Sequence, residues 1–525
     1  MPNRVAALVT AGAGEEVARR AVAAAQRAWD GWVRDTLSEF ADTPGFPAVQ
    51  WVCVPAGADG YAGQWERART LMDARRRIRD FAPQQWAGRV LCSLSPRWPA
   101  GPGPVKLRPY QQDTLSAANW VKRRWRQTRN LTGFASTSSI ASAAFRRDVL
   151  GCLDDQRVRG AVGRLAEAAR QLADEQETAV PGLPEGEDEL GRWLERSAGP
   201  WVYRDRWQAE PLARQCGLDV GAIRPAVGQG SEAASDLVRL MQEWGTRPPA
   251  SHLAVLVQDV NRMGLFLSGQ APDAAGRELA VSADAHRRVS DRLREIARRQ
   301  MSVLQRGDVH GVPVYAGGDD LLAFAPAASA LRAAADCQEL IGDDLPTAST
   351  AVLFFHHRAG LQPAITQARD MLDDAKAAAP GRPVLAAGFH RRSGAGGHTV
   401  QRWSADDGRS AADLLGLFTV NADCELSPRL VGDLERDRAE LAGLHGRDRD
   451  LYRAELGRLV RRHVRMPAGA PPDASGRAVD RAASAAADAL EWLGSGELSP
   501  HEPGGAGPRP ALAARVGVFL RQEAR

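Results

Sequence analysis

The sequence predicts an α+β protein in which ferredoxin-like units of strands and helices are joined to helical segments. Three observations carry this prediction. An apolar run at 252–260 precedes a helical pattern at 284–304 and a Gly-Gly hairpin at 312–324. A strand–helix–strand pattern opens the chain, and the stretches 143–245 and 410 onward are helical. With 525 residues, the chain is expected to form about two to four domains.

Charge, cysteine spacing and the length of the apolar runs limit the classes of protein to which this chain could belong. A formal net charge of +4 and a pI near 8.8 are compatible with nucleic-acid contact but do not demonstrate it. The six cysteines are scattered and form no Cys-x-x-Cys pair, so we expect reduced thiols rather than a zinc ribbon or a disulfide framework. No signal peptide and no apolar run of membrane-spanning length occurs, which predicts a cytoplasmic protein without membrane contact.

Residues 1–110 are predicted to form one unit of ferredoxin-like character. Strand-like runs at 4–10 and 48–54 flank an amphipathic stretch from 15 to 40. The family resemblance described below implies that this unit is only part of a domain, which would leave an edge strand or an apolar face for a partner chain to cover.

Residues 111–248 are predicted to form a basic and helical connecting domain. Between 111 and 150 there are seven Lys or Arg against two Asp, and basic and aromatic residues alternate at 119–126. Two interpretations fit this stretch: RNA backbone contact with base stacking, or a solvated helix whose tryptophans face a core. An acidic Pro/Gly loop at 181–189 interrupts the helical pattern that follows.

Residues 249–408 contain the side chains that suggest chemistry. The run 252–260 reads as a buried strand that delivers Asp259 near its C-terminal end. The order strand, helix, hairpin can place this acid beside the turn of the hairpin. Carboxylates gathered at one sheet edge can hold two divalent ions for an in-line phosphoryl transfer.

The hairpin at 312–324 brings two adjacent carboxylates to its turn. Its two apolar runs are joined by Gly317 and Gly318, and the turn exits through Asp319 and Asp320. Adjacent carboxylates repel each other and are costly to remove from water. The pair therefore either stays solvated or meets a cation.

The rest of this domain is predicted to consist of a helix at 327–341, a buried strand at 349–355 and a helix at 361–379. His356 and His357 follow the strand directly. Because neighbouring strand residues point to opposite faces, one metal cannot easily take both, and they are left out of the predicted metal site. The Gly-rich turn at 391–397 lacks the Walker pattern and is not predicted to bind phosphate in that way.

Residues 409–525 are predicted to form a C-terminal helical domain with Pro/Gly loops at 467–476 and 497–510. Its arginines alternate in part with acids, which is typical of a solvated helix bundle.

Several segments resemble the second palm domain of the large subunit of type III CRISPR effector complexes, specifically the Cmr type. The matching residues, in chain order, are Asp259 with Met263-Gly264, Gly317-Gly318-Asp319-Asp320, Ser349, Asp374-Ala375-Lys376 and Arg392-Ser393-Gly394. The palm also resembles diguanylate and adenylyl cyclases. The resemblance implies palm domains of the nucleotidyl cyclase or polymerase type, the first of them incomplete.

The same resemblance implies synthesis of cyclic oligoadenylate from ATP. The catalytic residues would be Asp259, Asp319 and Asp320, holding two ions, Mg²⁺ or Mn²⁺, with help from a backbone carbonyl near Val260. Nucleotide contacts would come from four further residues: Gly317, Gly318, Ser349 at the adenine and Lys376 at the triphosphate.

The implied partners are the other Cmr-type subunits, crRNA and target RNA. The C-terminal helical domain resembles the one that docks against the crRNA-bearing backbone of such complexes. The stretch 134–141 resembles a Ser/Thr-rich motif near bound nucleotide or RNA.

The sequence also departs from that family. The N-terminal HD nuclease domain and the start of the first palm have no counterpart, so no HD site is assigned, and a separate chain supplying that part is an expected partner. Asn261 stands where the family usually has an acid. Of a four-cysteine zinc site found in relatives only Cys92 is present, so zinc is not predicted.

Two alternatives stay open at this point. The chain could be a scaffold subunit with weakened catalysis that binds crRNA, target RNA and partner subunits. It could also be a free-standing cyclic-dinucleotide synthase, which the long helical and basic flanks disfavour. Metal-dependent ATP turnover that requires target RNA distinguishes the cyclase subunit from the scaffold.

Overall fold

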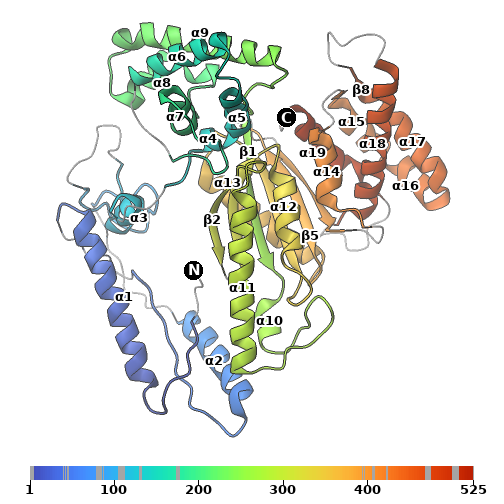
Figure 1. Ribbon diagram of the computed structural model, residues 1–525. Helices are drawn as coiled ribbons and strands as arrows, with labels where there is room; N and C mark the ends of the chain where they lie inside the picture. Colours follow the sequence, from blue (N-terminus) through green and yellow to red (C-terminus); the bar gives the residue numbers. More distant parts are fainter. Residues whose placement is uncertain are drawn as a thin grey trace.

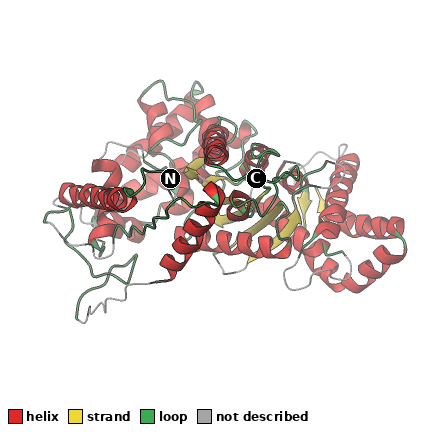
Figure 2. Cartoon of the chain, turned by 90° about the horizontal axis from the view of Figure 1, so that it is seen from below, coloured by secondary structure: helices red, strands yellow, loops and turns green. Residues whose placement is uncertain are grey.

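One sheet of six strands lies at the centre of the protein, and helices surround it (Figure 1). The computed structural model describes residues 5–39, 41, 43, 46–78, 86, 88–104, 113–128, 133–172, 178–317, 319–392, 394, 396–404, 408–420, 424–466, 475–498 and 508–523. Seen from below, the strands stay gathered in one region while helices make up most of the remainder (Figure 2). The predicted α+β class is confirmed.

The strands of this sheet are β1 (His252–Val260), β2 (Val312–Gly317), β3 (Asp320–Pro326), β4 (Ala348–His356), β5 (Val384–His390) and β6 (Gly396–Arg402). Their order across the sheet is β2-β3-β1-β4-β5-β6. The β4–β5 pair is parallel and the other pairs are antiparallel. The predicted hairpin is therefore confirmed as β2–β3.

The helices that follow these strands are α10 (Met263–Leu267), α11 (Ala283–Leu304), α12 (Ala330–Glu339) and α13 (Leu361–Ala378). Read along the chain, β1, α11, β2, β3, α12 and β4 have the βαββαβ connection of a ferredoxin-like unit. The predicted helices at 284–304, 327–341 and 361–379 are confirmed within a few residues of their ends.

Alternate side chains of β1 pack in two different hydrophobic cores, one on each face of the sheet. Ala254 and Leu256 face α12, whereas Leu253, Val255 and Val257 face α13. Because both faces are covered, every residue of β1 except Asp259 is buried, which explains the continuous apolar run in the sequence.

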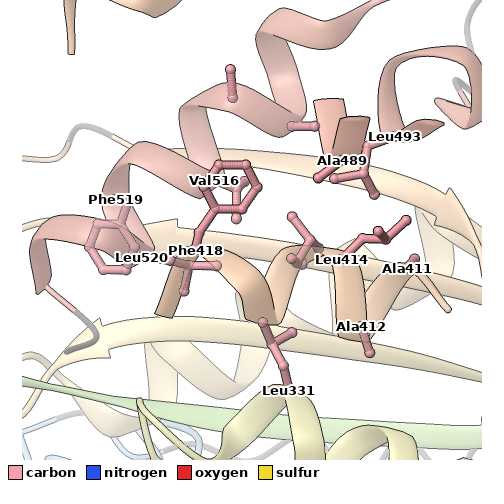
Figure 3. Packing of buried hydrophobic residues seen from close by; sticks show 14 of the residues in the cluster. Leu331, Ala411, Ala412, Leu414, Phe418, Ala489, Leu493, Val516, Phe519 and Leu520 are labelled. Atoms are coloured by element: carbon pink, nitrogen blue, oxygen red, sulfur yellow. The ribbon is translucent and has the colours of Figure 1, made fainter. Parts of the chain in front are cut away.

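The C-terminal helices complete the core on the α12 face. This part comprises α14 (Ala411–Val420), β7 (Glu425–Leu426), α15 (Arg429–Arg436), α16 (Arg438–Arg447), α17 (Arg449–His463), β8 (Val464–Arg465), α18 (Ser475–Gly496) and α19 (Pro510–Glu523). Figure 3 shows Phe519 and Val516 of α19 together with Phe418 of α14 and Leu331 of α12. Phe519 stacks on Phe389 of β5 with ring centroids 4.3 Å apart. The predicted C-terminal helices therefore share a core with the sheet.

The connecting region is helical, as predicted, and has a core of its own. Its elements are α4 (Thr137–Ala141), α5 (Ala143–Gly151), α6 (Gln156–Arg170), α7 (Glu189–Arg196), η2 (Arg204–Arg206), α8 (Ala209–Cys216) and α9 (Val220–Glu243). Arg146, fully buried, donates to the carbonyl oxygens of Ser139, Leu194 and Glu195. This guanidinium ties α4 and α5 to the end of α7.

The Ser/Thr-rich stretch 134–141 lies against the sheet end that is opposite Asp259. The Thr137 hydroxyl donates to the His357 carbonyl oxygen, and the Ser138 hydroxyl lies 2.8 Å from His357 Nδ1. These hydroxyl groups therefore hold the connecting helices to the sheet.

The prediction that His356 and His357 point to opposite faces is wrong. Strand β4 ends at His356, and the chain turns at once, so the two rings stack with centroids 4.7 Å apart. His357 also stacks on Tyr203 of the connecting region. Both histidines thus take part in a packed junction.

The N-terminal strands were predicted wrongly. Helix α1 (Gly14–Thr36) is present, followed by α2 (Gly60–Arg77) and α3 (Ala117–Thr128), but the described residues 5–10 and 48–54 form no strand. A strand needs a hydrogen-bonded neighbour, and among the described residues no backbone hydrogen bonds pair these segments with another strand; Val5 is 88% exposed and Leu8 64%. The described part of the N-terminal region therefore contributes no second sheet.

The basic and aromatic stretch at 119–126 lies on α3. Trp120 is buried with Trp29 and Val33 of α1, so this ring belongs to a core rather than to a base-stacking surface. Helix α2 contacts the N-terminal end of α11, where the Tyr61 hydroxyl lies 2.8 Å from His286 Nδ1 (Figure 1). No helix within the described ranges has the length and apolar character needed to cross a membrane. The domain boundaries at 110, 248 and 408 stay predictions.

Replacing Phe519 by Ala should lower the free energy of unfolding by about 3–5 kcal/mol, since the substitution leaves a cavity in a core shared by α19, β5 and α12. Urea unfolding followed by circular dichroism measures the change. Phe134→Ala is the matched control, because Phe134 is 56% exposed and should shift stability by less than about 0.5 kcal/mol. Equal effects of the two variants would contradict the shared core.

Candidate active site

The candidate site lies where β1, β3 and β4 end together. Asp259 of β1 is the register partner of Asp320 on β3 and of Ser349 on β4. Residues paired across neighbouring strands project from the same face of a sheet. The structure therefore brings Asp259, Asp320 and Ser349 to one face; the sequence had predicted Asp259 beside the hairpin turn, next to Asp319.

Asp319 completes the group from the hairpin turn. Its carbonyl oxygen accepts a hydrogen bond of 3.0 Å from the Val260 amide, which ties the turn to the end of β1. Gly317 is the last residue of β2 and pairs with Asp320, so it lies at the same edge. Gly318, also predicted to contact nucleotide, lies outside the described residues, as does Ser393.

The carboxylates of this site repel one another. Burial raises the pKa of Asp259, and the charges of Asp319 and Asp373 add to that shift. Partial removal from water, followed by the charges of Asp319 and Asp259, raises the pKa of Asp320 to about 6, although this first residue of the otherwise largely buried strand β3 is itself exposed. Ionising both Asp259 and Asp320 is thus unfavourable unless a cation joins them.

Lys376 provides one such cation. Its Nζ lies 2.5 Å from Asp259 Oδ1, and this pair lowers the pKa of Asp259 against the effect of burial. Helix α13 carries Lys376 across the sheet face, where Ala368, Leu372 and Ala375 pack against β1 and β4. The predicted helix-end lysine therefore contacts the first acid directly.

Helix α13 adds two charges that the sequence analysis missed. Arg369 lowers the pKa of Asp320, and Asp373 raises that of Asp259. Arg369, Asp373 and Lys376 follow each other at i, i+4 and i+7, the spacing of one helix face. That spacing in the sequence could have identified them as a group.

Asn261, two residues after Asp259, belongs to a network of hydrogen-bonded polar groups next to the carboxylates. Its Nδ2 donates to Thr347 Oγ1 and to the Arg382 carbonyl oxygen, both at 3.0 Å, and its Oδ1 accepts from Ser349 Oγ at 3.0 Å. The residue is only 4% exposed. An amide suits this position because it donates and accepts at once, whereas a carboxylate only accepts.

Ser349 is fully buried in the same network. Its single hydroxyl proton is directed to Asn261 Oδ1, with the Arg382 carbonyl oxygen 3.3 Å away. Recognition of adenine by this hydroxyl stays a prediction; donation to adenine would require that the bond to Asn261 opens, whereas acceptance from adenine would not.

A second polar cluster supports the site from the opposite face. Gln258, the neighbour of Asp259, donates to Gln338 of α12 and to Thr350 of β4, and accepts from Gln300 of α11. These bonds fix the end of β1 against both helices. These hydrogen bonds could not be predicted from the sequence, because their partners come from distant segments.

The donor set fits a hard divalent cation. Mg²⁺ is usually held by one or two carboxylates and completed by water and substrate phosphates. Asp259 and Asp320 are such carboxylates, and their mutual repulsion is relieved by a cation. Within the described ranges, no three His, Cys, Asp or Glu residues form a closed metal cluster. Substrate oxygens would therefore have to complete the coordination.

Residues 252–386 match the family model described as Cas10/Cmr2, second palm domain. This segment is similar to that domain of the Cas10/Cmr2 family. The resemblance inferred from the sequence is confirmed, and β1 to β5 with α10 to α13 are hereafter called the second palm domain.

One relative is the CRISPR system Cmr subunit Cmr2 of Pyrococcus furiosus (strain ATCC 43587 / DSM 3638 / JCM 8422 / Vc1). It is 27% identical over 172 residues, which are 28% of this chain and 19% of that protein. Two cryo-EM structures titled type III-B Cmr-beta, one in the apo state and one bound to cognate target RNA, also match. They are 12% and 11% identical, with TM-scores of 0.43 and 0.47, and the match covers 83% of this chain and 61% and 62% of theirs.

Replacing Asn261 by Asp should destabilise the protein, although it restores the acid common in the family. The new carboxylate would face the Arg382 carbonyl oxygen and could not donate to it, which costs about 1–3 kcal/mol. Urea unfolding at pH 7 measures this loss. Gln362→Glu, an exposed change on α13, is the control. Unchanged stability together with tighter Mn²⁺ binding would contradict the structural role of Asn261.

The pKa of Asp320 predicts a pH-dependent stability in the absence of metal. The folded state holds this proton up to about pH 6, whereas an unfolded Asp loses it near pH 4. The contribution to stability is therefore present below pH 4 and is lost as pH rises through 6. Unfolding free energies of the wild type and of Asp320→Asn, measured from pH 4 to 7, should differ by an amount that changes across this window. A constant difference would contradict the raised pKa.

Proposed function

We propose that the chain is the large subunit of a type III-B CRISPR effector complex and synthesises cyclic oligoadenylate from ATP. The observation that carries this proposal is the pairing of Asp259 with Asp320 at one edge of a Cas10/Cmr2 second palm domain, beside Asp319 and Lys376. Two carboxylates at adjacent strand ends, with a neighbouring lysine, suit a nucleotidyl transfer.

In the proposed reaction, the 3′-hydroxyl of one ATP attacks the α-phosphorus of another. A new P–O bond forms, the bond between the α-phosphorus and the bridging oxygen breaks, and pyrophosphate leaves while the hydroxyl loses its proton. Asp259, Asp319 and Asp320, with a backbone carbonyl near Val260, would hold the divalent ions. When bound, these ions lower the pKa of the attacking hydroxyl and neutralise charge on the phosphates.

The other residues would position the nucleotides. Lys376 is a compact positive charge that can bind the triphosphate. Gly317 and Gly318 would let phosphates approach the turn without a side chain in the way. Ser349 would contact adenine, and would leave Asn261 if it donates to the base.

The proposed partners follow from the same family assignment. The curated relative is named a Cmr subunit, and this chain would likewise assemble with Cmr-type subunits, crRNA and target RNA. The segment matched to the relative spans only about a fifth of that protein, so the assembly is part of the proposal.

The function is tested by incubating the reconstituted complex with labelled ATP, Mg²⁺ or Mn²⁺ and matching target RNA. Cyclic or linear oligoadenylates should form and should vanish in the Asp319→Ala/Asp320→Ala double variant, because the site loses two of its three carboxylates. A loss of at least about a hundredfold is expected when such groups are removed. Thermal unfolding checks that the variant is folded.

The matched control is Asp343→Ala/Asp344→Ala. These two acids are also adjacent and belong to the second palm domain, but they lie before β4, where Arg292 pairs with Asp344. Product formation should persist in this variant. Product that survives loss of Asp319 and Asp320 would refute the assignment. A complex that assembles fully and makes no product would support the scaffold function instead.

A further inference from the structure

Lys376 is one of very few lysines in this chain. The sequence contains 68 basic Lys and Arg residues, yet only three are lysines, at 106, 122 and 376. Arginine thus supplies nearly every positive charge, but lysine is present at the candidate site. The two differ physically: arginine holds a carboxylate with a planar fork, whereas lysine is a point charge on a flexible stem.

The position of Lys376 makes it a competitor for Asp259. Its Nζ lies 2.5 Å from Asp259 Oδ1, which is one of the oxygen atoms that a divalent ion would need. The two side chains are 25% and 31% exposed, so the pair is neither fully solvated nor sealed. The ammonium group of Lys376 is therefore already paired with this carboxylate.

The surroundings discourage Lys376 from leaving without a replacement. Asp319 and Asp373 both place negative charge near Asp259. Without Lys376, Asp259 would face these charges with no cation in contact, in a partly buried position. The lysine is thus expected to move only when another cation takes its place or when an anion attracts it.

Resting on the proposed function, we propose that Lys376 couples the binding of the divalent ion to that of the triphosphate. Lys376 occupies Asp259 in the free protein, and the phosphates draw it away, which opens Asp259 to the ion. Metal and nucleotide then bind with positive cooperativity, and each raises the affinity for the other by the same factor. Either ligand alone binds more weakly because it must displace the ion pair.

The test measures Mn²⁺ binding to the full chain by electron paramagnetic resonance, without and with the non-reactive analogue α,β-methylene-ATP. Lys376→Met should raise the Mn²⁺ affinity without nucleotide by roughly fivefold or more, since coupling between sites is typically of that size. It should also weaken analogue binding in EDTA and reduce the factor by which the analogue tightens Mn²⁺ binding.

Two further variants keep the result interpretable. Lys376→Arg should weaken Mn²⁺ binding without nucleotide, because the guanidinium holds the carboxylate with two hydrogen bonds. A folding defect common to Lys376→Met and Lys376→Arg would change the Mn²⁺ affinity of both variants in the same direction. Opposite changes therefore exclude misfolding as the cause. Arg369→Met removes a positive charge from the same face of α13 without removing the Asp259 pair, so it should change the Mn²⁺ affinity less than Lys376→Met does.

The outcomes separate this inference from the proposed function. If Mn²⁺ binding by the wild type does not depend on Asp319 and Asp320, the proposed metal site fails and the coupling fails with it. If binding does depend on those acids but Lys376→Met leaves the nucleotide-free affinity unchanged or weaker, only the coupling is overturned.

Discussion

The register of β1 with its two neighbours is the constraint on which the site depends. Asp259 meets Asp320 on one side and Ser349 on the other only because the β1–β3 and β1–β4 pairings are fixed along the whole strand. A slip of one residue would turn Asp259 toward α12 and bury Gln258 on the α13 face. Two separate apolar cores, one on each face of β1, oppose such a slip. The chemistry of the acids thus relies on hydrophobic packing several residues away.

The site is held in a state of unfavourable charge. Asp259, Asp319 and Asp320 share one edge of the sheet, and their repulsion is countered by Lys376 and, through its field, by Arg369. Hydrogen bonds between neutral side chains hold the strand ends in place. Asn261 and Ser349 form them on one face of the sheet, and Gln258 forms them on the other. Uncharged side chains therefore hold the strand ends, and the charged groups are gathered at the sheet edge.

The sequence predicted the elements whose signals are local and strong. The apolar run of β1, the Gly-Gly turn and the helical periods of α11 and α13 all appeared within a few residues of their positions. From these, Asp259 could be placed beside the hairpin turn that carries Asp319 and Asp320, whereas Lys376 was assigned to the site only through the family resemblance. The strands at 4–10 and 48–54 failed because an apolar run signals a strand only where a neighbouring strand exists to bond it. The roles of Asn261, Gln258 and Asp373 depend on contacts between distant segments, which no single stretch of sequence reveals.

The core that α19 shares with the sheet has a consequence for biosynthesis. Phe354 and Phe389 on the sheet contact Phe519, which the ribosome makes far later than either strand. Until α19 emerges, this apolar face of the sheet has no cover from it, while the connecting helices, with their separate core, can already pack. The nascent chain would therefore complete its second palm domain late, at a stage when an exposed aromatic surface favours chaperone binding.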